Sequence, residues 1–186
     1  LVIETEEAGQ ASEIPEQRID AKVARLQLLS PDVMELTVRT PRSRSLRFLA
    51  GQNVLLQFDR IDSKSLPIAS CPCDGLQLRF HVSRRHDSFS NLVFNRLKRG
   101  HSLTLLGPIG DFVLDEQSAR PLLMVAWKSG FAPIASLIDH AIQSQPERRI
   151  ALYWLADNPQ GHYQENACRA WRDALDHFSY QLITLD

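Results

Sequence analysis

Hydrophobic and polar positions follow two different patterns along this chain of 186 residues. Before about residue 115, apolar positions fall in short segments that often alternate with polar ones and are separated by turn residues such as Ser30-Pro31 and Gly107-Pro108. This pattern is typical of strands with one buried face. After residue 115, continuous apolar runs alternate with stretches of helical spacing, which indicates a parallel sheet connected by helices. The change of pattern predicts two units.

The first unit, residues 18–115, is predicted to be a small antiparallel β-barrel. Its expected strands are short and bordered by turn residues: Ala21–Leu29, Val33–Arg39, Asn53–Phe58, Leu76–Val82 and Ser102–Leu106. One helix is expected to interrupt them at Ser90–Lys98, where the apolar positions share one face and Ser90 is the predicted cap.

The second unit, residues 119–186, is predicted to be a shortened three-layer α/β nucleotide-binding-type domain. Its expected strands are Leu122–Ala126, Ile150–Leu155 and Tyr180–Leu185, and its expected helices are Ala132–Gln145 and Gln164–Asp176. Right-handed crossovers would give a parallel sheet covered on both sides. A sheet that stops at its third strand also leaves an edge and an apolar face, which predicts self-association or a partner through residues 148–186.

The composition of the chain limits which binding partners and which cellular location are expected. A net charge of −1, from 21 basic and 22 acidic residues, gives no sign of a nucleic-acid or anionic-membrane partner. Three cysteines are too few for a disulfide framework, and no apolar run is long enough to span a membrane, so a cytoplasmic location is predicted. Residues 1–17 are acidic and unpatterned, which indicates a tail or linker. The first residue is Leu, so the chain is expected to be a trimmed piece of a longer one.

The stretch from Pro121 to Pro133 carries the strongest chemical signal. An apolar strand runs into a short glycine turn and then into a helix, and the free amides at a helix N-terminus suit a pyrophosphate. Such a turn needs small residues so that the backbone can approach the ligand, yet Trp127 and Lys128 stand there. Gly130 is equally compatible with a plain strand-to-helix turn.

Several short motifs together resemble the ferredoxin–NADP reductase superfamily over residues 18–186. They are Pro15-Glu-Gln-Arg-Ile-Asp20, Ser30-Pro-Asp-Val-Met34, Leu49-Ala-Gly-Gln52, Ile68-Ala-Ser70, Gly130-Phe-Ala-Pro133 and Leu152-Tyr-Trp154. The likeness is to the CDP-6-deoxy-glucoseen reductase and aromatic-oxygenase reductase types. It implies that the barrel binds FAD or FMN and that the α/β unit binds NADH or NADPH. Hydride would pass from nicotinamide to flavin, and single electrons would pass to an iron–sulfur or oxygenase partner.

The resemblance assigns a first flavin motif to the residues before and including Ile68, Ala69 and Ser70. The family pattern Arg-x-Tyr-Ser reads here Lys64-Ser-Leu66-Pro67. Lys64 keeps the positive charge for a phosphate but not the bidentate fork of arginine. Leu66 would cover a ring face by apolar contact alone. Pro67 has neither a hydroxyl nor a backbone N–H to donate.

The remaining flavin positions implied by the resemblance are His81, Ser83 and Ser90. His81 falls on a barrel strand expected to border the flavin, Ser83 directly follows that strand, and Ser90 opens the helix whose amides would hold the pyrophosphate. Asp87 places a like charge beside that phosphate. The motifs therefore predict that any FAD is bound weakly.

The nicotinamide site is altered in a similar way. The family turn Gly-Thr-Gly-x-Ala-Pro matches residues 128–133, where Ser129, Gly130 and Pro133 keep the pattern and Lys128 replaces the first glycine. Asp157, after the next strand, would accept ribose hydroxyls and repel a 2′-phosphate, so NADH is predicted over NADPH. Binding of NADH is also predicted to be weak.

Three readings of function stay open on these residues. The first is an NADH-dependent flavin oxidoreductase module, and the second is a cofactor-free descendant that acts as a binding or scaffolding subunit of a redox assembly. The third is a regulatory domain that holds a small anionic nucleotide near Lys128. Cys71-Pro72-Cys73 is expected to hold two ordinary thiols, the alternative being a metal or redox pair.

Overall fold

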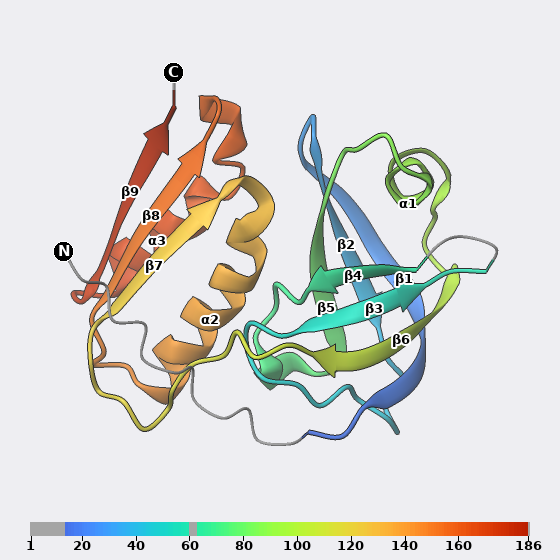
Figure 1. The fold of residues 1–186 in the computed structure, drawn as a ribbon, viewed down its shortest axis with the longest axis horizontal. Coiled ribbons are helices and arrows are strands. Elements are labelled where there is room, and N and C mark those ends of the chain that lie inside the picture. The colour runs from blue at the N-terminus through green and yellow to red at the C-terminus, as the bar shows by residue number, and fades with distance from the viewer. Residues whose placement is uncertain (1–13, 60–62, 186) are drawn as a thin grey trace.

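A computed structural model describes residues 14–59 and 63–185 of the chain. Figure 1 shows two halves side by side, a β-barrel and a three-stranded α/β unit, with a helix between them. Most of the predicted tail, residues 1–13, lies outside the described residues.

The barrel consists of six antiparallel strands in the order β4-β3-β6-β1-β2-β5. Their bounds are β1 (Gln17–Ser30), β2 (Val33–Arg39), β3 (Asn53–Gln57), β4 (Lys64–Pro67), β5 (Gln77–Ser83) and β6 (Ser102–Ile109). The backbone N–H of Ala69 donates to the carbonyl oxygen of Arg79 at 2.8 Å and nearly closes the barrel between β4 and β5. The predicted antiparallel barrel is confirmed. β4 was not predicted, because four residues ending in proline show no alternation.

The barrel interior is filled by the inward positions of these strands. Leu36, Val38, Leu56, Leu78 and Phe80 are completely buried in one apolar cluster. Alternation along β2, β3 and β5 turns these side chains into the barrel, so the hydrophobic pattern of the sequence explains the core directly.

The barrel helix begins earlier than predicted. α1 (Ser88–Asn91) continues into a wider helical turn, η2 (Leu92–Arg96). The cap is Asp87 rather than Ser90, because the Oδ1 of Asp87 accepts the backbone N–H of Ser90 at 2.6 Å. The hydroxyl of Ser90 instead accepts the backbone N–H of Arg85 at 2.9 Å.

The second half is a parallel sheet in the order β7-β8-β9. Its elements are β7 (Leu122–Trp127), η3 (Lys128–Gly130), α2 (Phe131–Ser144), β8 (Ile150–Ala156), η4 (Pro159–Gly161), α3 (Glu165–Ala174) and β9 (Phe178–Thr184). Trp154 of β8 is fully buried and stacks on Phe131 of α2 with 3.9 Å between ring centroids. Trp171 of α3 donates to Asp139 of α2 at 3.1 Å, so both helices pack on the same face of the sheet.

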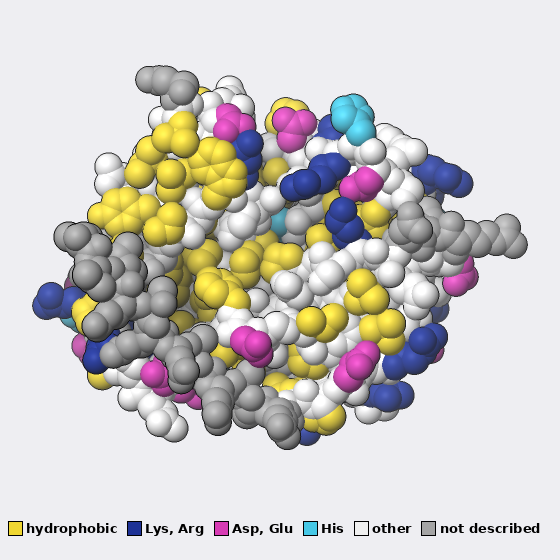
Figure 2. Space-filling view, in the orientation of Figure 1, with side chains coloured by type: hydrophobic (Ala, Val, Ile, Leu, Met, Phe, Trp, Pro, Cys, Tyr) yellow, Lys and Arg dark blue, Asp and Glu magenta, His cyan; other side chains and the backbone are white. Residues whose placement is uncertain are grey.

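The opposite face of this sheet carries exposed side chains, and among residues 14–59 and 63–185 the expected cover on both sides is present on one side only. Leu123 is 69% exposed, Val125 61%, Trp127 46% and Tyr153 38%. We call these four residues the open sheet face; hydrophobic side chains gather over the sheet at the upper left of Figure 2. Alternation explains the arrangement, because odd-numbered positions of β7 and β8 point away from the helices.

Helix α2 joins the two halves. The hydroxyl of Ser136 donates to the carbonyl oxygen of Ser70 at 2.7 Å, and Asp139 lies 3.7 Å from Arg79 of β5. The connection from the barrel passes over Gly51, whose φ of +92° suits glycine and where a Cβ would overlap the carbonyl oxygen of Phe112.

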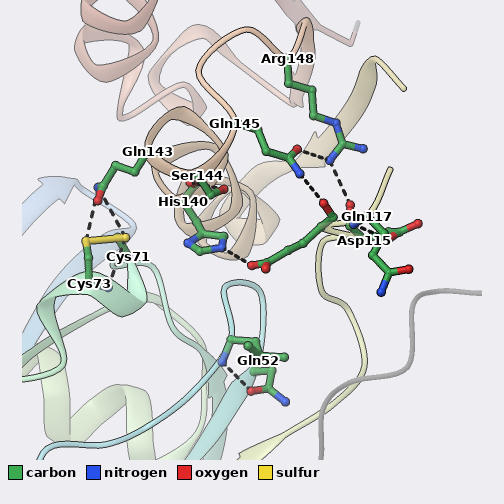
Figure 3. Close-up of polar contacts among 12 residues, drawn as sticks. Gln52, Cys71, Cys73, Asp115, Gln117, His140, Gln143, Ser144, Gln145 and Arg148 are labelled. Carbon is green, nitrogen blue, oxygen red and sulfur yellow. Dashed lines mark hydrogen bonds and ion pairs between the residues drawn. A yellow bond between two sulfur atoms is a disulfide. The ribbon is translucent and has the colours of Figure 1, made fainter. Parts of the chain in front are cut away.

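The connection is then fastened to the far end of α2. Glu116 binds His140 at 2.8 Å and accepts a hydrogen bond from Gln145 on its carbonyl oxygen, also at 2.8 Å (Figure 3). Arg148 donates to the carbonyl oxygens of Asp115 and Arg120. These contacts fix the position of the second half relative to the barrel.

Candidate functional site

A groove of about 890 Å³ lies between the two halves. One wall is formed by the residues that follow β7 and β8, and the other by the β1–β2 turn and the end of β5. Ligands of open α/β sheets bind beyond the carboxyl ends of the strands, so this is the expected place for a nucleotide. In Figure 2, Lys and Arg side chains gather in the upper part of the view, between the halves.

The charges in the groove suit an anionic ligand. Arg84, Arg85 and Lys128 line it, together with Asp32 and Asp157. A second hollow of about 620 Å³ shares Arg84, Arg85 and Asp32 with the groove and continues to α1. The guanidinium of Arg84 lies 4.1 Å from the ring centroid of Phe94, which holds its charge between the two hollows.

The turn after β7 is held in the conformation that a glycine would adopt. Lys128 has a φ of +51°, in the left-handed region where a side chain costs roughly 1 kcal/mol. Its ammonium binds the carboxylate of Asp157 at 2.5 Å and lies 5.1 Å from the ring centroid of Trp127. Lys128 therefore has a backbone conformation that is usual for glycine, and its ammonium adds a charge over the turn.

Two further hydrogen bonds anchor the same turn. The indole Nε1 of Trp154 donates to the carbonyl oxygen of Lys128 at 3.0 Å. The hydroxyl of Ser83, at the end of β5, donates to the hydroxyl of Ser129 at 2.7 Å. Ser83 and Ser129, assigned from sequence to different cofactors, thus meet across the groove. Gly130 and Pro133 follow in η3 and the first turn of α2.

His81 lies deeper between the two halves. Its Nδ1 is 3.1 Å from the hydroxyl of Tyr163, and its Nε2 is 3.9 Å from a carboxylate oxygen of Glu35. Burial, with a smaller contribution from Arg79, lowers the pKa of His81 to about 3, so the imidazole is neutral. Burial also raises the pKa of the Tyr163 hydroxyl. His81 is therefore an interface residue whose side chain is 3% exposed.

At the predicted flavin phosphate position, a carboxylate of the chain already stands. The ammonium of Lys64 binds the Oδ2 of Asp87 at 3.0 Å, while Oδ1 caps α1 through Ser90. The backbone N–H of Ser90, followed by the Lys64 contact, lowers the pKa of Asp87 below its ordinary value. The structure thus brings Lys64 and Ser90 together around Asp87.

The other residues of the first flavin motif belong to the barrel wall. Leu66 and Ile68 are buried in the barrel core, and Pro67 pairs with Asn53 of β3. Ala69 closes the barrel, and the hydroxyl of Ser70 accepts the backbone N–H of Arg79 at 3.2 Å. Their packing role is clear from the structure, and their role toward a flavin stays a prediction.

Among the groove residues that the sequence did not assign to a cofactor site are Arg84, Arg85 and Tyr163. From sequence, Arg84-Arg85-His86 is compatible with a small anion contact or a solvated loop, and only its position directly after β5 indicates that it faces the second half. For Tyr163 no sequence signal exists, because its contact with His81 joins residues 82 positions apart.

Comparisons with known proteins agree with this geometry. Reductase component 2 of terephthalate 1,2-dioxygenase from Comamonas sp is 35% identical over 164 residues, which are 88% of this chain and 49% of that protein. The CDP-6-deoxy-L-threo-D-glycero-4-hexulose-3-dehydrase reductase of Yersinia pestis is 30% identical over 152 residues, 81% of this chain and 45% of that protein. Over most of its length the chain is similar to reductase components, as the motifs predicted.

The family and fold predicted from the motifs are thereby confirmed. The crystal structure of the Amycolatopsis cytochrome P450 reductase GcoB matches with a TM-score of 0.84 at 20% identity, over 92% of this chain and 54% of that chain, which shows the shared fold. No protein-family model matches the chain. The chain spans about half the length of the curated relatives named above.

The groove residues fit nucleotide phosphates but are partly engaged with one another. Guanidinium and ammonium groups are suitable phosphate partners, and Arg84, Arg85 and Lys128 supply them along connected hollows. Against this, Asp87 and Asp157 neutralise the two lysines that the family resemblance assigns to phosphate. The groove therefore has the charge and the space for nucleotide phosphates, but at each end a carboxylate of the chain competes with the phosphate for a lysine.

Within residues 14–59 and 63–185, no helix is long and apolar enough to cross a membrane, and no group of His, Cys, Asp and Glu side chains is arranged to hold a metal ion.

Proposed function

We propose that this chain is the reductase module of an electron-transfer system, passing electrons from NADH through a flavin to an iron–sulfur or oxygenase partner. The observation that carries the proposal is the basic groove between the carboxyl ends of β7 and β8 and the end of β5. The similarity to the reductase component of a dioxygenase supports the same assignment. Because the relatives are about twice as long, the acceptor belongs to the proposal.

A flavin, when bound, supplies the chemistry by accepting a hydride and releasing electrons singly. The chain's residues bind and orient. Arg84 and Arg85 would offset phosphate charge along the shared wall of the two hollows. Lys128 would do so at the turn after β7, and Asp157 would then accept the ribose hydroxyls of NADH. The Lys128–Asp157 pair is about half exposed and separates at low cost.

We expect the flavin end of the site, beside Lys64 and Asp87, to bind its ligand less tightly than the nucleotide end, beside Lys128 and Asp157. Asp87 would repel a pyrophosphate at the N-terminus of α1 and keeps Lys64 occupied. Leu66 is committed to the barrel core and Pro67 offers no donor. We therefore infer weak FAD binding, so the flavin would leave readily during purification.

Visible absorption and stopped-flow kinetics test the proposal. Protein saturated with FAD should show a protein-bound flavin spectrum and slow, saturable bleaching on mixing with NADH. Arg85→Ala should weaken nucleotide binding, whereas Arg96→Ala, at the far end of the barrel helix and outside both hollows, serves as the charge-matched control. No flavin uptake at any concentration would reject the reductase assignment.

A second candidate function is a cofactor-free binding subunit of a redox assembly. The open sheet face favours it, because contiguous exposed apolar side chains mark interaction sites. We propose that this face and the neighbouring 148–186 region take up a second copy of the chain or a partner subunit. Light scattering across a wide concentration range checks the first alternative. Trp127→Ser with Tyr153→Ser should abolish association, and a monomer at all concentrations would reject self-association.

A further inference from the structure

The segment Cys71-Pro72-Cys73 lies against α2, away from the basic groove. It directly follows Ser70 and forms the short helical turn η1 (Pro72–Asp74). The two sulfurs are joined in a disulfide, drawn in yellow in Figure 3. The expected pair of ordinary thiols is therefore wrong.

The two sulfurs differ in their accessibility. Cys71 is 6% exposed, at the base of the turn, whereas Cys73 lies on the surface. A thiolate that opens a disulfide must reach one sulfur and displace the other. An incoming thiol therefore has access to Cys73 and not to Cys71.

The same structure provides donors for the sulfur that would be displaced. The backbone N–H of Cys73 donates to the Sγ of Cys71 at 3.3 Å. The side-chain amide of Gln143, on α2, lies 3.6 Å from the Sγ of Cys71 and 3.3 Å from the Sγ of Cys73 (Figure 3). N–H donors stabilise a thiolate more than a neutral sulfur, so the backbone N–H of Cys73, which points at the Sγ of Cys71, favours the release of Cys71 as the leaving group. The Gln143 amide lies within reach of both sulfurs and can stabilise the thiolate that is released.

We propose that Cys71–Cys73 is a thiol–disulfide exchange site that is attacked at Cys73 by an external dithiol. The donor thiolate bonds to the Sγ of Cys73, the Cys71–Cys73 bond breaks, and its electron pair leaves on Cys71. The donor's second thiolate then attacks the mixed disulfide and releases Cys73. The donor ends as a disulfide, and two electrons and two protons have passed to the cysteine pair.

This activity is separate from the proposed reductase function and touches the contact between the two halves. Gln143 follows Ser136 and Asp139 on the face of α2 that meets the barrel. Opening the disulfide releases the two sulfurs from one another while Gln143 stays on the helix. Exchange therefore occurs at the interface and not in the basic groove.

The first test is a thiol count under native conditions. The protein as purified is equilibrated in glutathione buffers of increasing reducing strength, quenched in acid, and labelled with a maleimide after unfolding. Intact mass should show one label in oxidising buffers, on Cys168, and three in reducing buffers, with two appearing together. Cys168 is fully buried and burial raises the pKa of its thiol to about 12, so it is the unreactive internal reference. Resistance of the pair to reduction until the protein unfolds would overturn the proposal.

The second test identifies the attacked sulfur. In Cys71→Ser, the remaining Cys73 should form a mixed disulfide with glutathione disulfide at least tenfold faster than Cys71 does in Cys73→Ser, as its exposure requires. Gln143→Leu should slow native-state reduction of the wild-type pair by roughly threefold to tenfold. The matched control is Ser144→Ala, whose hydroxyl bonds only within α2. Equal rates for the two single-cysteine variants would contradict attack at Cys73.

Discussion

Two lysine–aspartate pairs stand where the superfamily resemblance expects cofactor phosphates, and they differ in how firmly each is held. Lys64–Asp87 lies at the start of α1, and Lys128–Asp157 lies beyond β7 and β8. Asp87 also caps a helix, and its pKa is lowered by that bond first and by Lys64 second. Asp157 is 57% exposed and makes its contact at the surface.

The two lysine–aspartate pairs therefore have different consequences for cofactor binding. A ligand that displaces Asp157 breaks one exposed ion pair, worth about 0–1 kcal/mol. A ligand that displaces Asp87 must also uncap α1, which costs about 1 kcal/mol more. The nucleotide end is thus open to competition by a ligand, whereas the flavin end is closed by a structural residue.

The largest expected effect comes from rebuilding the flavin motif. Lys64→Arg, Leu66→Tyr and Pro67→Ser together should tighten FAD binding by several kcal/mol, since each restored contact contributes roughly 1–3 kcal/mol. Calorimetric titration with FAD measures the change. Because Leu66 is a core residue, the double variant Lys64→Arg with Pro67→Ser is the folding control and should retain part of the gain. Nanomolar affinity of the unmodified protein for FAD would show that Asp87 does not block the flavin end.

Removing the charge of Asp87 should raise the affinity for FAD, whereas removing the charge of Asp157 should lower the affinity for NADH. Asp87→Asn keeps a capping side chain but removes the like charge, so FAD affinity should rise by about tenfold, or roughly 1.4 kcal/mol. Asp157→Asn frees Lys128 but loses the ribose acceptor, so NADH affinity should fall by a smaller factor. Fluorescence titration of both variants gives the two signs. A rise in both affinities would mean that Asp157 is only a competitor.

Clearing the turn after β7 should affect binding more than rate. Trp127→Gly with Lys128→Gly removes two large side chains and should improve NADH binding more than it speeds flavin reduction in stopped flow. Lys128→Gly alone should also raise the free energy of unfolding by about 0.5–1 kcal/mol, because φ at this position is +51°. Rapid saturable reduction of the unmodified protein by micromolar NADH would show that the turn is already open.

The smallest expected effect is on the pH dependence of the free energy of unfolding, to which Asp87 and Asp139 contribute with opposite sign. The folded-state pKa of Asp87 is lowered, so its stabilising contribution is complete above the ordinary value of 3.8 and disappears as the pH falls through the lowered value. Burial, only partly offset by Arg79 and Trp171, raises the pKa of Asp139, so its contribution is lost as the pH rises. Urea unfolding of Asp87→Asn and Asp139→Asn from pH 3 to 7 should give difference curves of opposite slope.

The fold could be predicted because its signals are local. Alternation in Val33–Arg39 gave β2 with its observed bounds, and the continuous run before Trp127 gave β7. Of the predicted site residues, Lys128 and Ser129 lie in the groove because they directly follow β7, and their role toward a cofactor stays a prediction. The cap at Asp87 was missed because Ser and Asp are equally good caps and only the backbone decides between them. The His81–Tyr163 contact and the Cys71–Cys73 bond depend on the folded backbone, which no residue pattern reveals.

The contacts of helix α2 restrict movement of the two halves relative to one another. Its contacts with the barrel, from Ser136 through Asp139 to Gln143, lie in its middle and C-terminal parts, and the connection is held just beyond its end by Gln145 and Arg148. A hinge needs a segment that can bend while its flanks stay intact, and this boundary has several bonds that must break at once. We therefore expect ligands to enter by side-chain rearrangement at the groove, with the two halves moving as one body on the timescale of binding.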